Sequence, residues 1–216
     1  MKKKNMSFII NIIIFLLLIV GLVLETFELI MRGEGLHLLV RRFKFFTELS
    51  NIFAGITAFV YAYYLFNSKG KNPIPKLLKI FKLFSTSSVV VTFLTVVFYL
   101  IPVSGSDWKL LVVGSQFIFH IVNPILCFIT CTFYEDNKVD NKYLIYNLIP
   151  ITAYGFFYLT MSLTHVVDGV IPYEYDWYLF MKNGLLIGLI TYAFFIIFNY
   201  VLVYFLNMIN SKLNTK

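Results

Sequence analysis

Two groups of polar residues stand within apolar stretches of this sequence, and their types suit proton transfer and hydrogen bonding. The stretch FFTELSN at residues 45–51 supplies Thr47, Ser50 and Asn51. The second group is centred on His120, in the middle of a later apolar run. A histidine within a membrane segment indicates either a functional site or a neutral ring that links two helices by hydrogen bonds. The residue types alone leave both interpretations open.

The spacing of the second group predicts one face of a helix. Gln116, His120, Asn123 and Cys127 follow one another at intervals of 4, 3 and 4 residues, which places them on the same side of a helix. Pro124 lies four residues after His120, so we expect a kink or a freed backbone carbonyl there.

The first group shares its predicted helix face with small residues, which allow another helix to approach closely. The members of this face are Thr47, Ser50, Asn51, Ala54, Ala58 and Ala62. We expect the face to point into a bundle of helices. The alternative for Thr47 and Ser50 is that each hydroxyl bonds to a carbonyl of its own helix one turn earlier.

Composition places both groups inside a membrane. Of 216 residues, 59% are hydrophobic and 13% are charged, whereas soluble domains average ~45–50% and ~25%. We therefore predict an integral membrane protein. The formal charge of +7 comes from short basic clusters between apolar spans, which set topology, so no nucleic-acid partner is predicted. Cys127 and Cys131 lie in an apolar run and are predicted to be buried free thiols.

A bilayer core requires ~20 mostly apolar residues per helix, and six segments meet this requirement. They lie near residues 7–29, 45–67, 83–102, 108–133, 143–164 and 177–209. We predict an all-α bundle of six transmembrane helices that forms a single domain over residues 1–216 in the cell membrane. If both termini are cytoplasmic, twelve of the 18 Lys and Arg residues fall on the inner side and six on the outer side, which favours that orientation.

No metal or cofactor is predicted. His165 and Asp168 are three residues apart, as are Glu25 and Glu28, but no clustered spacing of His and Cys accompanies them. The sequence also lacks the G-x-S-x-G elbow of serine hydrolases, the Walker loop and the G-x-G-x-x-G dinucleotide motif.

Three short motifs give the chain a family resemblance. FKFFTELSNIF, FIFHIVNPIL and THVVDGVIPY occur in this order on a chain with six predicted spans. That combination resembles the androgen-induced and androgen-dependent membrane hydrolases, and still more the bacterial six-span proteins grouped with them. The resemblance covers essentially the whole chain. It implies hydrolysis of fatty acid esters of hydroxy fatty acids, with Thr47 and His120 at the positions of the family's catalytic threonine and histidine.

The implied chemistry is physically reasonable. A threonine hydroxyl needs a base, and neutral His120 is suited to accept its proton and return it to the leaving alcohol. The oxyanion needs hydrogen-bond donors, for which Asn51, Gln116 and Asn123 are the candidates. Further residues expected to support the site are Ser50, Glu48 and His165. The expected partners are membrane lipids or a lipid ester substrate, and the sequence does not define the oligomeric state.

Contact between Thr47 and His120 depends on where their helices begin. With starts at Phe45 and Trp108, the two residues would lie ~3 Å and ~18 Å below the helix ends, too far apart in depth to touch. A start near Leu36 would bring Thr47 to ~16 Å and restore the contact. The contact is therefore expected only on the condition that this helix begins near Leu36.

Two other functions use the same polar faces. One is a small transporter or channel, although neither paired broken helices nor inverted repeats occur in the sequence. The other is a lipid-binding or partner-binding membrane protein without catalysis, which does not require Thr47 and His120 to meet. The usage of lysine and isoleucine, with only three arginines, is typical of an AT-rich bacterial genome.

Overall fold

The computed structural model of the protein describes residues 2–33, 35 and 41–214. Over these residues the chain is helical apart from its connections and one isolated bridge between Val167 and Val170. Six helical segments in this part of the chain are long and apolar enough to cross a membrane. They are Lys3–Met31, Phe46–Asn67, Lys76–Val103, Ser115–Tyr134, Asn141–Thr164 and Leu185–Leu213. The prediction of an all-α protein with six membrane helices is confirmed.

The chain divides into two compact units, which are described separately. The larger unit comprises Met1–Val139 with Phe205–Lys216, and the smaller unit comprises Asp140–Tyr204. The prediction of a single domain stays a prediction.

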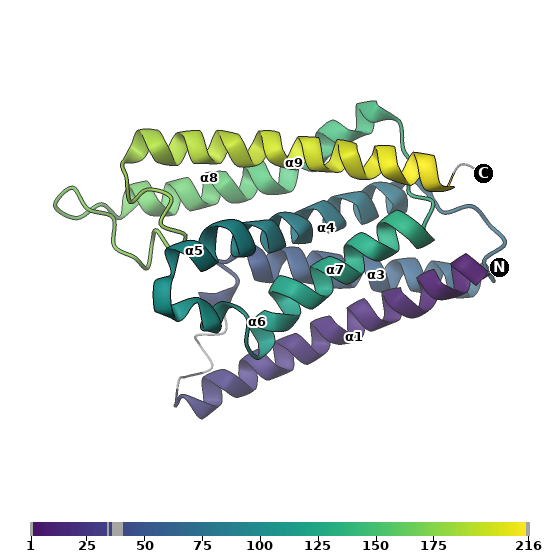
Figure 1. Ribbon diagram of the computed structural model, residues 1–216, viewed down its shortest axis with the longest axis horizontal. Coiled ribbons are helices and arrows are strands. Elements are labelled where there is room, and N and C mark those ends of the chain that lie inside the picture. Colours follow the sequence, from purple (N-terminus) through teal and green to yellow (C-terminus); the bar gives the residue numbers. More distant parts are fainter. Residues whose placement is uncertain (1, 34, 36–40, 215–216) are drawn as a thin grey trace. The chain divides into compact units, whose positions relative to one another are not determined.

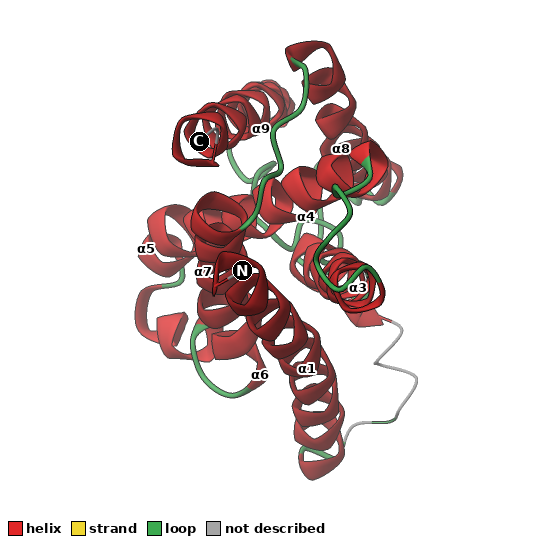
Figure 2. Ribbon diagram, turned by 90° about the vertical axis from the view of Figure 1, so that its right-hand side faces the viewer, coloured by secondary structure: helices red, strands yellow, loops and turns green. Residues whose placement is uncertain are grey.

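Four long helical segments make up most of the larger unit, and Figures 1 and 2 show α1 lying against α3 and α7. The first two are α1 (Lys2–Met31) and α3 (Phe46–Asn67). The third is α4 (Lys76–Thr95), continued by the π-turn η1 (Val96–Leu100) and α5 (Ile101–Val103). The fourth joins α6 (Ser115–Phe117), the π-turn η3 (Ile118–Val122), α7 (Asn123–Ile129) and the π-turn η4 (Thr130–Tyr134). The 3₁₀ segment η2 (Gly105–Leu111) connects the last two.

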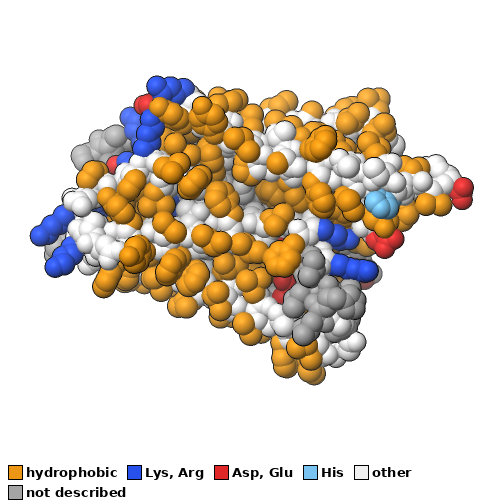
Figure 3. Space-filling view, turned by 180° about the vertical axis from the view of Figure 1, so that it is seen from behind, with side chains coloured by type: hydrophobic (Ala, Val, Ile, Leu, Met, Phe, Trp, Pro, Cys, Tyr) orange, Lys and Arg blue, Asp and Glu red, His pale blue; other side chains and the backbone are white. Residues whose placement is uncertain are grey.

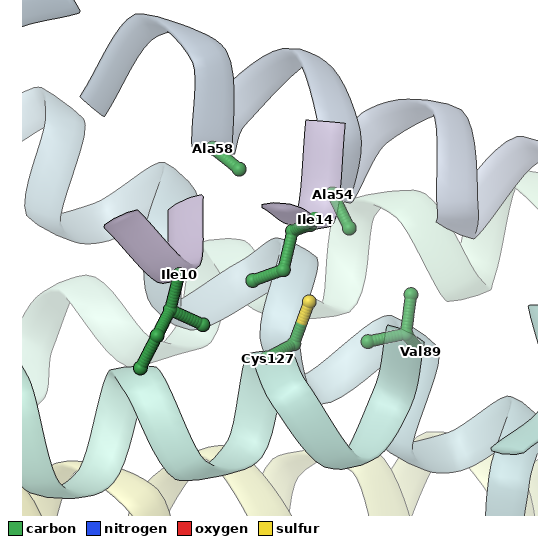
Figure 4. Packing of buried hydrophobic residues seen from close by; sticks show 6 residues of the cluster. All are labelled: Ile10, Ile14, Ala54, Ala58, Val89 and Cys127. Atoms are coloured by element: carbon green, nitrogen blue, oxygen red, sulfur yellow. The ribbon is translucent and has the colours of Figure 1, made fainter. Parts of the chain in front are cut away.

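Small residues bring α1 close to its neighbours. A Cβ atom at Gly55 of α3 would lie 2.4 Å from Leu18 Cδ2, and one at Gly21 of α1 would lie 2.4 Å from the ring of Phe119. Figure 4 shows the core that results, with side chains from α1, α3, α4 and α7: Ile10, Ile14, Ala54, Ala58, Val89 and Cys127. Close van der Waals packing of this kind between helices holds the larger unit together.

Three predicted helix boundaries are wrong. The third span begins at Lys76, directly after Pro75, rather than near residue 83, because its basic first turns are also helical. The fourth begins at Ser115 rather than Trp108, because Gly114 adopts φ 61°, a conformation that interrupts a helix. The sixth begins at Leu185 rather than near residue 177.

In the smaller unit, η5 (Asn141–Asn147) and α8 (Leu148–Thr164) pack against the first part of α9 (Leu185–Asn214). The Asn199 amide donates to the Asn147 carbonyl at 3.2 Å, and the Tyr192 hydroxyl donates to the Thr152 carbonyl at 2.9 Å. Some residues before α9 are buried without being helical: Trp177 and Met181 are each 5% exposed, and the Trp177 indole donates to the Tyr154 hydroxyl at 3.1 Å. This packing explains why the apolar run from residue 177 does not start a helix.

The ends of the first and last helices meet at Glu135 in the larger unit. Ser7 of α1 donates to a Glu135 carboxylate oxygen at 3.3 Å, and Asn210 of α9 donates to the Glu135 backbone carbonyl at 2.7 Å. This contact agrees with six spans, because an even number of spans places the start of the first helix and the end of the last on the same side of the membrane. Which side is cytoplasmic stays a prediction.

The outer surface of the helices is apolar. Large hydrophobic side chains such as Val23, Phe27, Phe66 and Phe98 are 58–74% exposed, and hydrophobic side chains cover most of the surface visible in Figure 3. Helices that remain apolar on their exposed faces are suited to lipid rather than water. The structure therefore supports a multi-pass membrane protein.

Candidate functional site

The polar face of α3 points into the larger unit, as its spacing predicts. Thr47, Ser50 and Asn51 are 7%, 3% and 0% exposed, and the alanines that continue the face are also buried. The Ser50 hydroxyl lies 3.0 Å from the Thr47 carbonyl and 3.0 Å from the Thr92 hydroxyl of α4. Ser50 thus bonds both to its own helix and to a neighbour, which makes it a packing residue beneath Thr47.

Thr47 and His120 are in hydrogen-bond contact. Thr47 Oγ1 lies 3.3 Å from His120 Nε2, and the histidine is 4% exposed. His120 Nδ1 lies 2.5 Å from the carbonyl oxygen of Leu111, which can only accept a hydrogen bond. Nδ1 therefore carries the ring proton, and in the neutral ring Nε2 is left as an acceptor for the Thr47 hydroxyl.

The contact forms by a different route from the one expected. α3 begins at Phe46, close to the predicted start, and Phe45 before it is extended, so no continuous helix runs through Phe45. Leu36 itself lies outside the described residues. The fourth span begins at Ser115, which places His120 only ~7.5 Å past its start. Both residues thus lie near the same end of their helices, and the η2 segment is free to present its Leu111 carbonyl.

Asn51 donates a hydrogen bond to a backbone carbonyl that is left unpaired in the helix that carries His120. Its amide nitrogen donates to the Phe119 carbonyl at 3.0 Å and to the Thr47 carbonyl at 2.9 Å. In a π-turn the Phe119 carbonyl would accept from the N–H of residue 124, and Pro124 has none. The freed carbonyl predicted at the proline is therefore present, one residue earlier than the His120 carbonyl.

The three oxyanion candidates differ in the donors they retain. Both N–H groups of Asn51 are used, so this residue has none left for an oxyanion. Asn123 donates to the Asn51 side-chain oxygen at 3.2 Å, which leaves it one N–H. Gln116 lies beside the Glu48 carboxyl, which accepts one of its N–H groups, so Gln116, like Asn123, retains one N–H.

A cluster of carboxyl groups lies beside Thr47 and His120. Glu25 and Glu48 are each 2% exposed, and Arg42 Nε lies 3.3 Å from Glu25 Oε1. Glu28 accepts from the backbone N–H and the hydroxyl of Ser115, both at 3.0 Å, and so caps the helix that carries His120.

His165 belongs to the smaller unit. Its ring stacks on Tyr175 with 3.7 Å between centroids, and its Nδ1 lies 2.9 Å from the Met161 carbonyl. These contacts are with its own unit and give it a packing role at the end of α8. No group of three or more His, Cys, Asp or Glu residues able to hold a metal ion occurs among the residues that the structure describes.

A second buried polar network was not predicted. Lys82, counted in the sequence as an inner charge, is 1% exposed; its Nζ lies 3.5 Å from Glu135 Oε1 and 2.5 Å from Asn11 Oδ1. Asn137 donates to Glu135 Oε2 at 2.6 Å. The sequence feature that could have indicated this network is the pair Asn207 and Asn210, which are polar residues three positions apart near the end of the last apolar span. Cys127 and Cys131 are buried free thiols, as predicted.

Comparisons of the chain with protein-family models, with curated proteins and with solved structures found no match. The family resemblance therefore rests on the three sequence motifs, and the activity it implies is a proposal.

Proposed function

We propose that the protein is an intramembrane hydrolase of lipid esters that uses Thr47 as nucleophile and His120 as general base. The observation that carries the proposal is the chain of contacts from Thr47 Oγ1 to His120 Nε2 and from His120 Nδ1 to the Leu111 carbonyl. A nucleophile, a base and a group that orients the base are the three parts of nucleophilic acyl transfer. The resemblance favours fatty acid esters of hydroxy fatty acids and a bacterial cell membrane.

In the first half of the reaction, Thr47 Oγ1 attacks the ester carbonyl carbon while its proton passes to His120 Nε2. The Leu111 carbonyl stabilises the imidazolium that forms, because it accepts the hydrogen bond from Nδ1. The tetrahedral oxyanion is suited to the free N–H groups of Gln116 and Asn123. Collapse breaks the bond to the alkoxy oxygen, and the alcohol leaves with the proton from Nε2.

In the second half, water attacks the acyl-threonine ester. His120 Nε2 accepts the proton of the water, and the second collapse returns that proton to Thr47 Oγ1 and releases the fatty acid. Because substrate and both products are lipids, a site between helices near one end of the bundle is a reasonable place for this chemistry.

The test is hydrolysis of long-chain esters by protein purified in detergent. Wild type should hydrolyse them, and Thr47→Ala and His120→Ala should each lower the rate by several decades, as expected for loss of a nucleophile or its base. The matched controls are Thr130→Ala, which removes a buried hydroxyl bonded to its own helix at 2.6 Å, and His165→Ala in the smaller unit. Equal rates in all variants, or no hydrolysis by wild type across a broad panel, would favour a binding protein or transporter.

A further inference from the structure

The connection between α8 and α9 carries the third sequence motif, THVVDGVIPY, which the proposed reaction does not use. In the smaller unit it folds as a short β-hairpin. The N–H of Val167 donates to the Val170 carbonyl and the N–H of Val170 donates to the Val167 carbonyl, both at 2.9 Å. Asp168 and Gly169 form the turn with φ 50° and 78°, and positive φ at both positions is what a two-residue hairpin turn of this type requires. The facing backbone groups of the two valines therefore need no partner outside the hairpin.

The hairpin presents an apolar face to its surroundings. Val167 and Val170 stand opposite each other, so their side chains project side by side from one face. They are 60% and 67% exposed, and Tyr173, which follows in the chain, is 69% exposed. Adjacent exposed apolar side chains, unlike single scattered ones, mark an interaction surface.

Polar and aromatic contacts hold the base of the hairpin at the end of α8. The His165 ring stacks on Tyr175, and the Ser162 hydroxyl donates to the Tyr175 carbonyl at 2.7 Å. Farther along the connection, the buried Asp176 carboxylate accepts from the N–H of Met181 at 3.2 Å. The position of the valines is therefore set by the packing of the smaller unit.

The apolar face of the hairpin continues the lipid-facing surface of α8. Phe156 and Leu163 lie seven residues apart on one side of α8 and are 69% and 44% exposed. α8 ends at Thr164, directly before the hairpin, and Figure 1 shows the connection extending past the ends of α8 and α9. Exposed apolar side chains thus continue along the chain from the membrane helix into the hairpin: Leu163, Val166, Val167 and Val170. This continuity indicates lipid as the material that covers the face.

The length of the hairpin matches the headgroup layer of a bilayer. The hydrocarbon core is ~30 Å thick and the bilayer with its headgroups is ~40–45 Å thick, which leaves ~5–8 Å of headgroups on each side. The span Asn141–Thr164 has 24 residues, enough to reach the edge of the hydrocarbon core. One arm of the hairpin, residues 165–167, extends at most ~10 Å farther. The valines are thus within reach of the acyl chains, and Asp168 at the turn lies nearer to water.

The charges of the connection favour one kind of headgroup. From Leu163 to Met181 the chain has three acidic residues and no lysine or arginine. Two of the three, Asp168 and Glu174, are exposed. An anionic headgroup would be repelled by these carboxylates, whereas a headgroup with an ammonium group is attracted to them.

We propose that the hairpin at residues 165–173 lies in the lipid headgroup layer with its Val167–Val170 face toward the acyl chains, and that it favours headgroups with an ammonium group over anionic ones. Tyr173 suits the same place, because tyrosine is enriched where membrane and water meet. This surface belongs to the smaller unit and does not depend on the ester hydrolysis proposed above.

Nitroxide labels on single introduced cysteines test the contact in reconstituted bilayers. Molecular oxygen relaxes a label that lies in lipid, and a water-soluble nickel chelate relaxes one that lies in water. The labels are placed at Val167→Cys and Val170→Cys, with Phe156→Cys as the lipid reference and Lys71→Cys, in an exposed basic connection, as the water reference. Wild type, whose two cysteines are buried, is the labelling control. In phosphatidylcholine bilayers both hairpin labels should be relaxed more by oxygen than by nickel.

A second set of variants tests the valine face itself. With the label at Tyr173→Cys, the double substitution Val167→Ser with Val170→Ser should abolish the preference for oxygen, because the apolar face is removed. The matched control is Val23→Ser, which changes a valine that is 61% exposed on α1 and should leave the label at position 173 unaffected.

The headgroup preference is tested with the label at Val167→Cys in two kinds of bilayer. The preference for oxygen should be weaker in phosphatidylglycerol, which is anionic, than in phosphatidylcholine, which carries an ammonium group. Asp168→Asn should reduce this difference, because it removes one carboxylate while asparagine tolerates the positive φ of the turn.

Relaxation dominated by nickel at both Val167 and Val170, as at Lys71, would overturn the proposal and leave a protein partner as the occupant of the face. An oxygen preference at Tyr173 that survives the double substitution would refute the role of the valines. Equal oxygen preference in the two bilayers would refute the selection of headgroups.

Discussion

At the scale of single residues, the contact between Thr47 and His120 distinguishes two substitutions at position 47. Thr47→Ser retains a hydroxyl that can reach His120 Nε2, so it should keep a measurable fraction of ester hydrolysis and of labelling by a serine and threonine hydrolase probe. Thr47→Ala should lose both. Neither change should lower the melting temperature much, because hydrogen bonds between membrane helices average ~0.6 kcal/mol. Equal labelling of the Ala and wild-type proteins would contradict the assignment of Thr47.

The buried ion pair of Lys82 and Glu135 predicts a larger effect on stability. Lys82→Met leaves a buried carboxylate without its cation, which typically costs about 3–5 kcal/mol. The double variant Lys82→Met with Glu135→Gln should recover part of this loss, because a neutral amide needs no cation and can still accept from Ser7 and Asn11. Thermal unfolding in detergent measures the loss of stability in the single variant and its recovery in the double variant. A double variant that is less stable than Lys82→Met would contradict the account.

At the scale of the elements, the position of His120 depends on how its helix begins. Gly114 adopts φ 61°, and a Cβ atom there would lie 2.1 Å from Glu28 Oε1. Gly114→Ala should displace Glu28 from Ser115, shift the start of α6 and lower ester hydrolysis by about tenfold or more, since small misplacements of catalytic groups are costly. Gly105→Ala is the matched control: Gly105 has φ 57° in the same connection, but nothing lies within 4 Å of its Cβ position. Equal losses in both variants would indicate backbone strain alone.

The sequence predicted the faces of the helices better than their ends. The intervals among Gln116, His120 and Asn123 depend only on helical periodicity, and the structure places all three on the fourth span. The start of that span depends instead on Gly114 and its contact with Glu28, a residue 86 positions earlier in the chain. The role of the Leu111 carbonyl could not be predicted, because a backbone group leaves no signature in the residue type.

The same limit applies to Lys82. In the sequence it follows four lysines of a basic segment, so it reads as a charge that sets topology. Its burial depends on Asn11 of α1 and Glu135 after η4, which are distant in the chain and become its neighbours only when the helices pack.

At the scale of the whole molecule, the six spans and the distribution of basic residues predict the membrane topology. Reporter fusions at Lys71 and Lys216 should both give a cytoplasmic signal, and a fusion at Gly169 should give an external one, because lysine and arginine favour the cytoplasmic side. An external signal at either lysine would contradict the orientation. The chemistry proposed above would then open to the opposite leaflet.

The hydrogen bond between His120 Nδ1 and Leu111 also has a consequence for experiments that survey substitutions. Every residue type at position 111 supplies the same carbonyl oxygen, so the partner that orients the His120 ring cannot be deleted by changing a side chain. A complete substitution scan read out by ester hydrolysis should find positions 47 and 120 intolerant and position 111 permissive. Replacing the amide between residues 111 and 112 by an ester through semisynthesis weakens that carbonyl as an acceptor, and is the change expected to expose its contribution.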